Sequence, residues 1–206
     1  MGLSVDYYFA PASPWTYLGH QRFADLIQGS GAALRLLPID LAEVFPVSGG
    51  LPLGKRAPQR QAYRLLELAR FRDHLKLPLN LKPKFFPVSG DDAARLILAV
   101  DQSDGVEPAM RLAGAVLRAV WAEERNIAEA SVLGELLAES DLDAKLLEQS
   151  RLPSIQKSYE ACTQAAIDAG VFGSPSFVVD GELYWGQDRL DFVERRLRAA
   201  TEARSH

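Results

Sequence analysis

Ser13 is the first residue whose position could support chemistry. It stands between a run of β-forming residues and Pro14, in the segment YYFAPASPWTYLGH of residues 7–20. A serine before proline at the start of a helix is usually an N-cap, because its side-chain oxygen accepts one of the unpaired backbone N–H groups. The same N–H groups and the helix dipole also stabilise an anion such as a thiolate. The sequence leaves both interpretations of Ser13 open.

Cys162 is the only cysteine of the chain, and it falls in a predicted helix far from Ser13 in sequence. A single cysteine can form neither an internal disulfide, nor a CxxC redox pair, nor a thiolate metal cluster. A thiol that reacts near Ser13 would therefore have to come from a bound molecule. In that case we expect the Ser13 hydroxyl to donate a hydrogen bond to the sulfur.

A Ser–His–Asp triad is the main alternative chemistry for Ser13. The three histidines are His20, His74 and His206, and His20 follows Ser13 by seven residues, which is about 10 Å along a helix. No GxSxG sequence surrounds Ser13. The scattered histidines argue against a hydrolase triad and against a metal site.

Two segments near the C-terminus offer groups that could bind a peptide. Ser174-Pro175 directly precedes a predicted hairpin, and a proline at that place should either start the strand or be cis. A cis bond would leave the backbone of Ser174 able to pair with an extended peptide. In the segment YWGQDRL of residues 184–190, Asp188 is expected to cap a final helix. The helix start could bind a carboxylate, and Asp188 could pair with an ammonium group.

Two further segments could contact a small anionic or aromatic molecule. Lys55 and Arg56 belong to the Gly/Pro-rich stretch of residues 44–58, which is predicted to be a loop. They could be an ordinary solvated charge pair or a clamp for an anionic substrate. Phe85 and Phe86 lie between prolines, where they could close the core or form the wall of an aromatic pocket.

The order of predicted elements indicates an α/β, thioredoxin-like fold with a large α-helical insertion. A strand, a helix and a second strand form a βαβ unit, several amphipathic helices follow, and the chain ends with a helix, a hairpin and a helix. Residues 1–40 and 154–206 would form the discontinuous thioredoxin-like domain, and residues 41–153 the inserted helical domain. The expected strands are 4–10 and 33–39 with a hairpin at 176–185 around Asp180-Gly181; the expected helices are 13–28, 59–75, 91–102, 107–124, 131–139, 142–150, 154–169 and 188–200.

Composition narrows the classes of function. Of the 206 residues 48% are hydrophobic and 24% are charged, as in ordinary globular proteins, and the net charge is -4. No overall basic field favours nucleic acid, no apolar segment approaches the roughly 20 residues of a membrane span, and residues 1–9 lack the pattern of a signal peptide. With a single cysteine, a reducing cytoplasmic setting is expected.

The segments VDYYFAPASPWTYLGHQRF and GVFGSPSFVVDGELYWGQDRLDFVERRL together resemble the 2-hydroxychromene-2-carboxylate isomerases. These enzymes belong with the kappa-class glutathione transferases and with the DsbA-like branch of the thioredoxin superfamily. The resemblance implies bound glutathione in place of a protein cysteine, a small aromatic carboxylate as substrate, and a homodimer. It implies isomerisation of 2-hydroxychromene-2-carboxylate or a similar aromatic α,β-unsaturated keto acid. A kappa-class glutathione S-transferase or peroxidase, and a non-catalytic thioredoxin-like binding module, are the alternatives.

The resemblance also implies roles for individual residues. Ser13 would be catalytic and would bind the glutathione sulfur, and the backbone of Ser174 would pair with the cysteinyl part. The γ-glutamyl end would be held by Trp185, Gly186, Gln187 and Asp188, and the organic substrate would contact Lys55, Arg56 and Phe85. The chain departs from the family in FAPASP, where Ala10 and Pro11 replace the usual FDFxSP pattern, and at Phe45, where some relatives have a basic residue.

Overall fold

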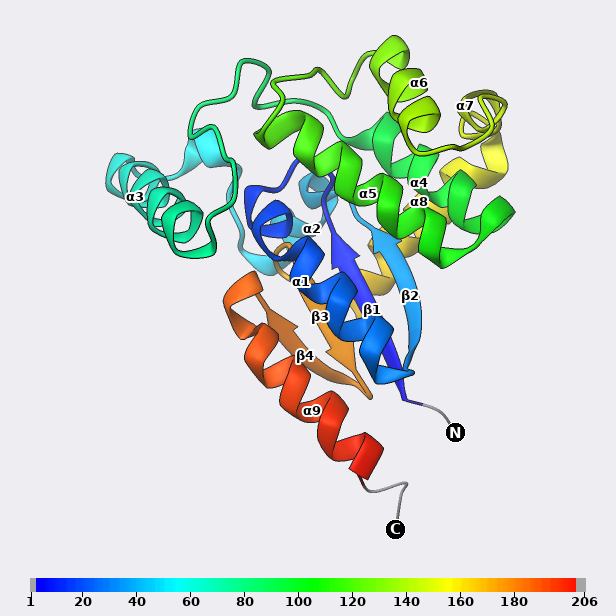
Figure 1. Cartoon of the computed structure of the whole chain (residues 1–206). Helices are drawn as coiled ribbons and strands as arrows, with labels where there is room; N and C mark the ends of the chain where they lie inside the picture. The colour runs from blue at the N-terminus through cyan, green and yellow to red at the C-terminus, as the bar shows by residue number, and fades with distance from the viewer. Residues whose placement is uncertain (1–2, 203–206) are drawn as a thin grey trace.

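A mixed four-stranded sheet forms the centre of the molecule, as seen in the computed structural model (Figure 1), which describes residues 3–202 and the side chains of residues 3–199. The strand order is β2-β1-β3-β4. Strand β1 pairs in parallel with β2 and antiparallel with β3, and β3 pairs antiparallel with β4. The predicted βαβ unit and the predicted hairpin are both confirmed. The strands are β1 (Ser4–Phe9), β2 (Ala33–Pro38), β3 (Ser176–Val179) and β4 (Glu182–Trp185).

Strand β1 lies inside the sheet and has large buried side chains on both of its faces. Tyr7 stacks on Phe9 and on Phe177 of β3, with ring centroids 4.9 Å and 5.3 Å apart, on the face that carries the largest hydrophobic cluster. Tyr8 points to the opposite face and packs with Val178 in a second cluster. A strand with two buried faces needs helices on both sides of the sheet.

The helices supply those two layers. Figure 1 shows α1 and α9 in front of the sheet, and α1 also packs against α5; α8 contacts β2, α2 and α4. The largest hydrophobic cluster joins side chains of the sheet to side chains of α4 and α5. The division into a thioredoxin-like domain and an inserted domain at 41–153 stays a prediction. The helices are α1 (Pro14–Ser30), α2 (Leu41–Ser48), α3 (Pro58–Leu75), α4 (Asp91–Asp104), α5 (Val106–Trp121), α6 (Ala130–Glu139), α7 (Leu146–Gln149), α8 (Pro153–Asp168) and α9 (Leu190–Glu202), with short 3-10 turns η1 (Leu53–Lys55) and η2 (Gln187–Arg189).

Two local predictions in the helical region are wrong. Residues 44–58 are not all loop, because α2 occupies their first part and contains Pro46. The Asp40 side chain caps α2 by accepting the N–H of Ala42 at 2.7 Å, and Gly49, with φ 75°, ends it. These two end signals outweigh the one backbone hydrogen bond that Pro46 removes. The helix expected at 142–150 is reduced to the single turn of α7.

Gly19 allows α1 and the η2 turn to approach closely. A methyl group on Gly19 would lie 2.6 Å from Cβ of Gln187 and 3.3 Å from its Cα, both on rigid parts of the chain. Gly29, on the same helix, has no atom within 4 Å of the corresponding position.

We therefore expect Gly19→Ala to lower the free energy of unfolding by roughly 1–3 kcal/mol, because the methyl group overpacks this contact. Gly29→Ala is the matched control and should raise stability slightly, by up to about 1 kcal/mol, through better helix propensity. Urea unfolding of both variants measures the difference. Equal stabilities of the two variants would show that the contact between α1 and η2 is not tight.

Candidate active site

A cavity of about 790 Å³ opens beside the carboxyl end of β1, where several helices begin. This volume is in the range of cavities that hold a small molecule. Helix starts carry unpaired backbone N–H groups and the positive end of the helix dipole, so the wall of this cavity favours negative charge. The residues of helix starts that line it are Ser13 and Pro14 of α1, Asp40 and Leu41 of α2, Ala57 of α3, and Gly90 and Asp91 of α4.

Ser13 is the N-cap of α1, as one interpretation of the sequence predicted. Its Oγ accepts the N–H of Thr16 at 3.2 Å, and its hydroxyl donates to the carbonyl oxygen of Ser174 at 3.3 Å. The side chain is largely buried, yet it lines the cavity. Capping and a position beside a bound molecule are therefore compatible, because rotation of the hydroxyl redirects its proton without moving the oxygen.

Ser174 lies against Ser13 although 161 residues separate them in sequence. The peptide bond between Ser174 and Pro175 is cis, which decides between the two alternatives left by the sequence. The Oγ of Ser174 accepts the N–H of Ala10 at 2.8 Å and lies 2.8 Å from the Thr16 hydroxyl. Among the described residues no acceptor is found for the Ser174 N–H. The side chain thus fixes the segment, and the backbone N–H is left for a ligand.

The segment from Trp185 to Asp188 only partly reaches the cavity. Trp185 is half-exposed, lines the cavity and packs against Phe172 with ring centroids 4.8 Å apart. Gln187 is buried against Gly19, and neither it nor Gly186 or Asp188 lines the cavity.

The prediction that Asp188 caps the last helix is wrong. Gly186, with φ 97°, starts the η2 turn, and α9 begins only at Leu190. The Asp188 carboxylate instead pairs with Arg189, 2.6 Å away. The left-handed turn at Gly186 is what separates the strand from the helix and places Asp188 inside the 3-10 turn.

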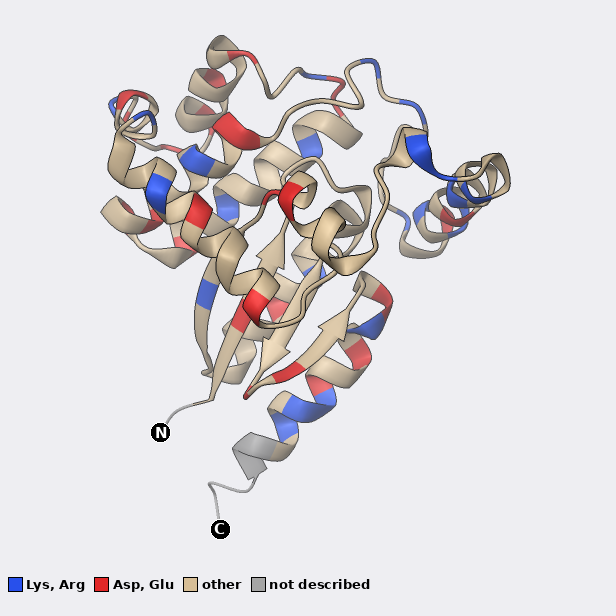
Figure 2. Ribbon diagram, turned by 180° about the vertical axis from the view of Figure 1, so that it is seen from behind, with Lys and Arg blue, Asp and Glu red and all other residues tan. Residues whose placement is uncertain are grey.

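Arginines at the start of α3 form one side of the cavity. Arg56 lines it, as do Arg60 and Arg64, whereas Lys55 is exposed and does not. Figure 2 shows the concentration of Lys and Arg along α3. Arg60 and Arg64 are not among the residues predicted from the sequence. Their spacing of four residues, which places side chains on one face of a helix, was the available signal.

Phe86, rather than Phe85, lines the cavity. Phe86 packs against Trp121 with ring centroids 4.8 Å apart, whereas the ring of Phe85 lies under the ammonium group of Lys84 at 5.0 Å. The two neighbouring aromatic side chains thus divide between the wall of the cavity and a charged surface contact.

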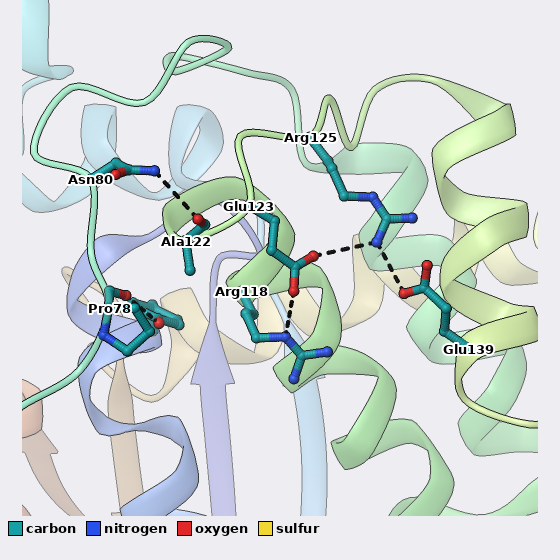
Figure 3. Close-up of polar contacts among 8 residues, drawn as sticks. Pro78, Asn80, Arg118, Ala122, Glu123, Arg125 and Glu139 are labelled. Carbon is teal, nitrogen blue, oxygen red and sulfur yellow. Dashed lines mark hydrogen bonds and ion pairs between the residues drawn. The ribbon is translucent and has the colours of Figure 1, made fainter.

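The segment that carries Phe86 is tied to α1 and to the end of α5. The Tyr17 hydroxyl donates to the carbonyl of Pro78 at 2.6 Å, and the side-chain amide of Asn80 donates to the carbonyl of Ala122 at 3.4 Å. These polar contacts hold the segment against both helices. Figure 3 shows the ion pairs beside them, which link Arg118, Glu123, Arg125 and Glu139.

His20 does not act as a base for Ser13. Its Nε2 lies 2.9 Å from the carbonyl of Met110, which can only accept, so Nε2 carries the proton and Nδ1 accepts from the Tyr7 hydroxyl at 3.1 Å. Burial lowers the pKa of His20 to about 4, against a weaker opposing effect of the Met110 carbonyl. The imidazole is a neutral, fully satisfied core group outside the cavity.

Cys162 lies in the core, outside the cavity, in a cluster with Leu98 and Tyr159. Burial raises the pKa of its thiol to about 11, so the thiol is protonated and unreactive at neutral pH. Within residues 3–202 no three His, Cys, Asp or Glu side chains are arranged to hold a metal ion. None of the helices in that range has the length and apolar character needed to cross a membrane.

Comparison with known proteins agrees with this geometry. The DSBA-like thioredoxin domain family matches residues 4–198. The chain is 29% identical to a 2-hydroxychromene-2-carboxylate isomerase of Sphingobium xenophagum (96% of this chain, 99% of that one) and 30% identical to one of Pseudomonas putida (92% of each). A solved structure of a 2-hydroxychromene-2-carboxylate isomerase, 26% identical, superimposes with a TM-score of 0.79 over 98% of both chains. Human glutathione S-transferase kappa 1 is 24% identical over 94% of this chain and 90% of its own.

These matches confirm the thioredoxin-like fold class and the resemblance seen in the sequence. Because the named isomerases align over nearly the whole chain, they also support an isomerase as the class of enzyme.

The buried His20 predicts a pH dependence of stability. Its pKa is about 4 in the folded chain and near its ordinary 6.5 in the unfolded chain, so the unfolded chain binds more protons between these values. The stability that the neutral imidazole contributes is therefore fully present above pH 6.5 and is lost as the pH falls toward 4, by about 3 kcal/mol in total.

Urea unfolding at several pH values between 7 and 4.5 measures this loss. His20→Gln should lose less stability over that range than the original chain, whereas His74→Gln, at an exposed position, provides the matched control. Parallel pH profiles for the original chain and His20→Gln would contradict the assignment of a neutral, buried imidazole.

Proposed function

We propose that this isomerase, which belongs to the DsbA-like thioredoxin domain family, uses bound glutathione to interconvert the isomers of an aromatic α,β-unsaturated keto acid. The observation that carries the proposal is the contact of Ser13, at the start of α1, with Ser174, whose backbone N–H has no acceptor among the described residues. Both residues line a cavity that no thiol of the described chain lines. A site of this kind has the groups to hold a sulfur anion but no sulfur of its own.

The residues present fit a small peptide thiol. The N–H of Ser174 can pair with the backbone of an extended peptide, as an added strand would. Ser13 lies beside it with a hydroxyl that can donate to sulfur, at a helix start that favours an anion. The cavity of about 790 Å³ leaves room for a second molecule beside the peptide.

When bound, glutathione would supply a nucleophilic sulfur for reversible addition to the carbon–carbon double bond, so that the bond can rotate before elimination restores it and releases glutathione unchanged. Ser13 would hold the sulfur in its anionic form by donating a hydrogen bond, in addition to the electrostatic effect of α1. Ser174 would fix the cysteinyl backbone, and the arrangement would bring the reacting atoms together. Cys162 takes no part, because its thiol is buried and protonated.

The remaining predicted contacts belong to this proposal. Trp185 lines the cavity and would cover the peptide, while Gly186, Gln187 and Asp188 would meet its γ-glutamyl end where that end extends beyond the cavity. Arg56, which lines the cavity, would contact the aromatic substrate, with Lys55 and Phe85 at the rim. We take 2-hydroxychromene-2-carboxylate as the substrate, because the relatives of nearly full length carry that name.

A kappa-class glutathione S-transferase or peroxidase is the second candidate, favoured by the likeness to human glutathione S-transferase kappa 1. The two candidates differ in the fate of glutathione. Isomerisation leaves its concentration constant while the product accumulates, whereas transfer or peroxidase activity consumes it. Measurement of free thiol during turnover therefore separates the two functions.

Glutathione should stabilise the folded chain. At 100 times its dissociation constant, a ligand that binds only the folded state raises the free energy of unfolding by about 2.7 kcal/mol, which for a chain of this size corresponds to roughly 5–10 °C in Tm. Thermal unfolding with glutathione, and with the analogue that has serine in place of cysteine, measures the effect and the contribution of the sulfur. No shift with millimolar glutathione would favour a binding module that does not use this peptide.

Removal of the Ser13 hydroxyl should reduce isomerase turnover. We expect Ser13→Ala to lower kcat about 100-fold, as the loss of one donor to a developing or bound anion does. Ser13→Ala also removes the cap of α1, at a cost of about 1 kcal/mol, whereas Ser13→Gly costs only a few tenths. Ser13→Gly is therefore the matched control for stability, and both variants should lose turnover equally. Unchanged turnover in either variant would remove Ser13 from the mechanism.

A further inference from the structure

Three arginines stand on one wall of the cavity without an acidic partner. Arg56 precedes α3, and Arg60 and Arg64 follow at intervals of four residues. Among the described residues none of the three forms a salt bridge, although many other arginines of the chain do. The wall therefore carries positive charge with which no carboxylate of the described residues forms a direct pair.

The two carboxylates that line the cavity are already occupied. Asp40 accepts the N–H of Ala42 at 2.7 Å as the cap of α2. Asp91 accepts the hydroxyls of Ser89 at 2.8 Å and of Tyr159 at 3.1 Å. Neither carboxylate lies within salt-bridge distance of the arginines, so the positive charge remains available to a bound anion.

Arg64 differs from its two neighbours in its surroundings. Its guanidinium lies over the rings of Phe86 and Trp121, at 5.2 Å and 5.7 Å from their centroids. Burial, and to a lesser extent the charge of Arg56, lowers the pKa of Arg64 to about 10, so it stays protonated at neutral pH. The aromatic rings thus hold a partly desolvated cation beside the cavity.

The hydrogen-bonding groups of Arg64 have no acceptor within the described part of the chain. Arg56 donates from Nε to the carbonyl of Leu51 at 2.8 Å, but Arg64 donates to no acceptor among the described residues. A guanidinium that is partly removed from water and lacks an acceptor is costly, and its planar donors match a carboxylate in a two-bond pair. Arg64 therefore has the form of a receptor for a planar acidic group.

We propose that Arg64 binds the acidic group of the aromatic substrate and that it makes the cavity select aromatic acids over neutral aromatic molecules. The inference rests on the proposed function in taking this cavity as the site of the second substrate. It gives Arg64 the main role, and Arg56 and Arg60 the lesser one of adding to the positive field of the wall.

A pair of probes that differ only in charge tests the proposal. We would titrate the protein with 2-hydroxycinnamate and with its neutral methyl ester, following tryptophan fluorescence, both without other ligands and with S-methylglutathione, which cannot react. The original chain should bind the acid about 10- to 100-fold more tightly than the ester, as expected for a charge-assisted hydrogen-bonded pair. Arg64→Gln should abolish this preference by weakening the acid alone, and Arg64→Lys should keep part of it.

Arg70→Gln is the matched control, because Arg70 belongs to the same helix but is exposed and paired with Glu67. It should bind both probes as the original chain does, and Arg56→Gln and Arg60→Gln should reduce the preference only slightly. The proposal is wrong if Arg64→Gln, with an unchanged thermal transition, keeps the full preference for the acid. It is also wrong if Arg56→Gln or Arg60→Gln abolishes that preference instead, or if the original chain has none.

The titration also separates this proposal from the proposed function, because it needs no turnover. Glutathione-independent preference for the acid that requires Arg64, together with an absence of isomerase activity, would overturn the proposed function and leave the acid receptor in place. Isomerase activity with an acid preference that does not depend on Arg64 would overturn the receptor and leave the function in place.

Discussion

The candidate site depends on the hydrogen bonds of the Ser174 side chain. Its Oγ accepts the N–H of Ala10 and meets the hydroxyl of Thr16, which joins segments 164 and 158 residues apart in sequence. These bonds bring the cis-Pro175 segment against the start of α1 and hold it there. The Ser174 carbonyl oxygen also accepts the Ser13 hydroxyl, but the Ser174 N–H has no partner among the described residues. A ligand could not pair with this N–H if the N–H itself held the two segments together.

The charges around this junction are arranged by burial as much as by residue type. Four helices begin at the cavity, and three arginines add to the positive field there, while the two carboxylates are engaged by donors of the chain. In the core, by contrast, titratable groups are uncharged, because burial keeps His20 neutral and Cys162 protonated. The positive charge thus lies at the cavity, whereas the imidazole of His20 and the thiol of Cys162 are uncharged in the core, although both groups can react in a more exposed setting.

Part of the candidate site could be predicted from local sequence, and part could not. Ser13 and Ser174 were found because serine before proline marks a backbone position, and both line the cavity with Trp185 and Arg56. Arg60 and Arg64 were missed because only the direction of α3 decides which of its faces meets the cavity. Which of the neighbouring residues Phe85 and Phe86 faces the cavity likewise depends on the backbone path of a segment that is neither helix nor strand. Asp188 was misplaced because a 3-10 turn intervenes before α9.

The sequence by itself determined the order of the elements, the βαβ unit, the hairpin and the absence of any second cysteine, because periodicity, end signals and composition are local or global properties of the chain. The tertiary structure decided which polar groups remain unused. Contacts between distant segments leave the N–H of Ser174 and the donors of Arg64 without acceptors among the described residues. They also keep the imidazole of His20 buried and neutral. The burial of a group and its hydrogen-bond partners depend on the residues that surround it in space, and the spacing of residues along the sequence does not identify those residues.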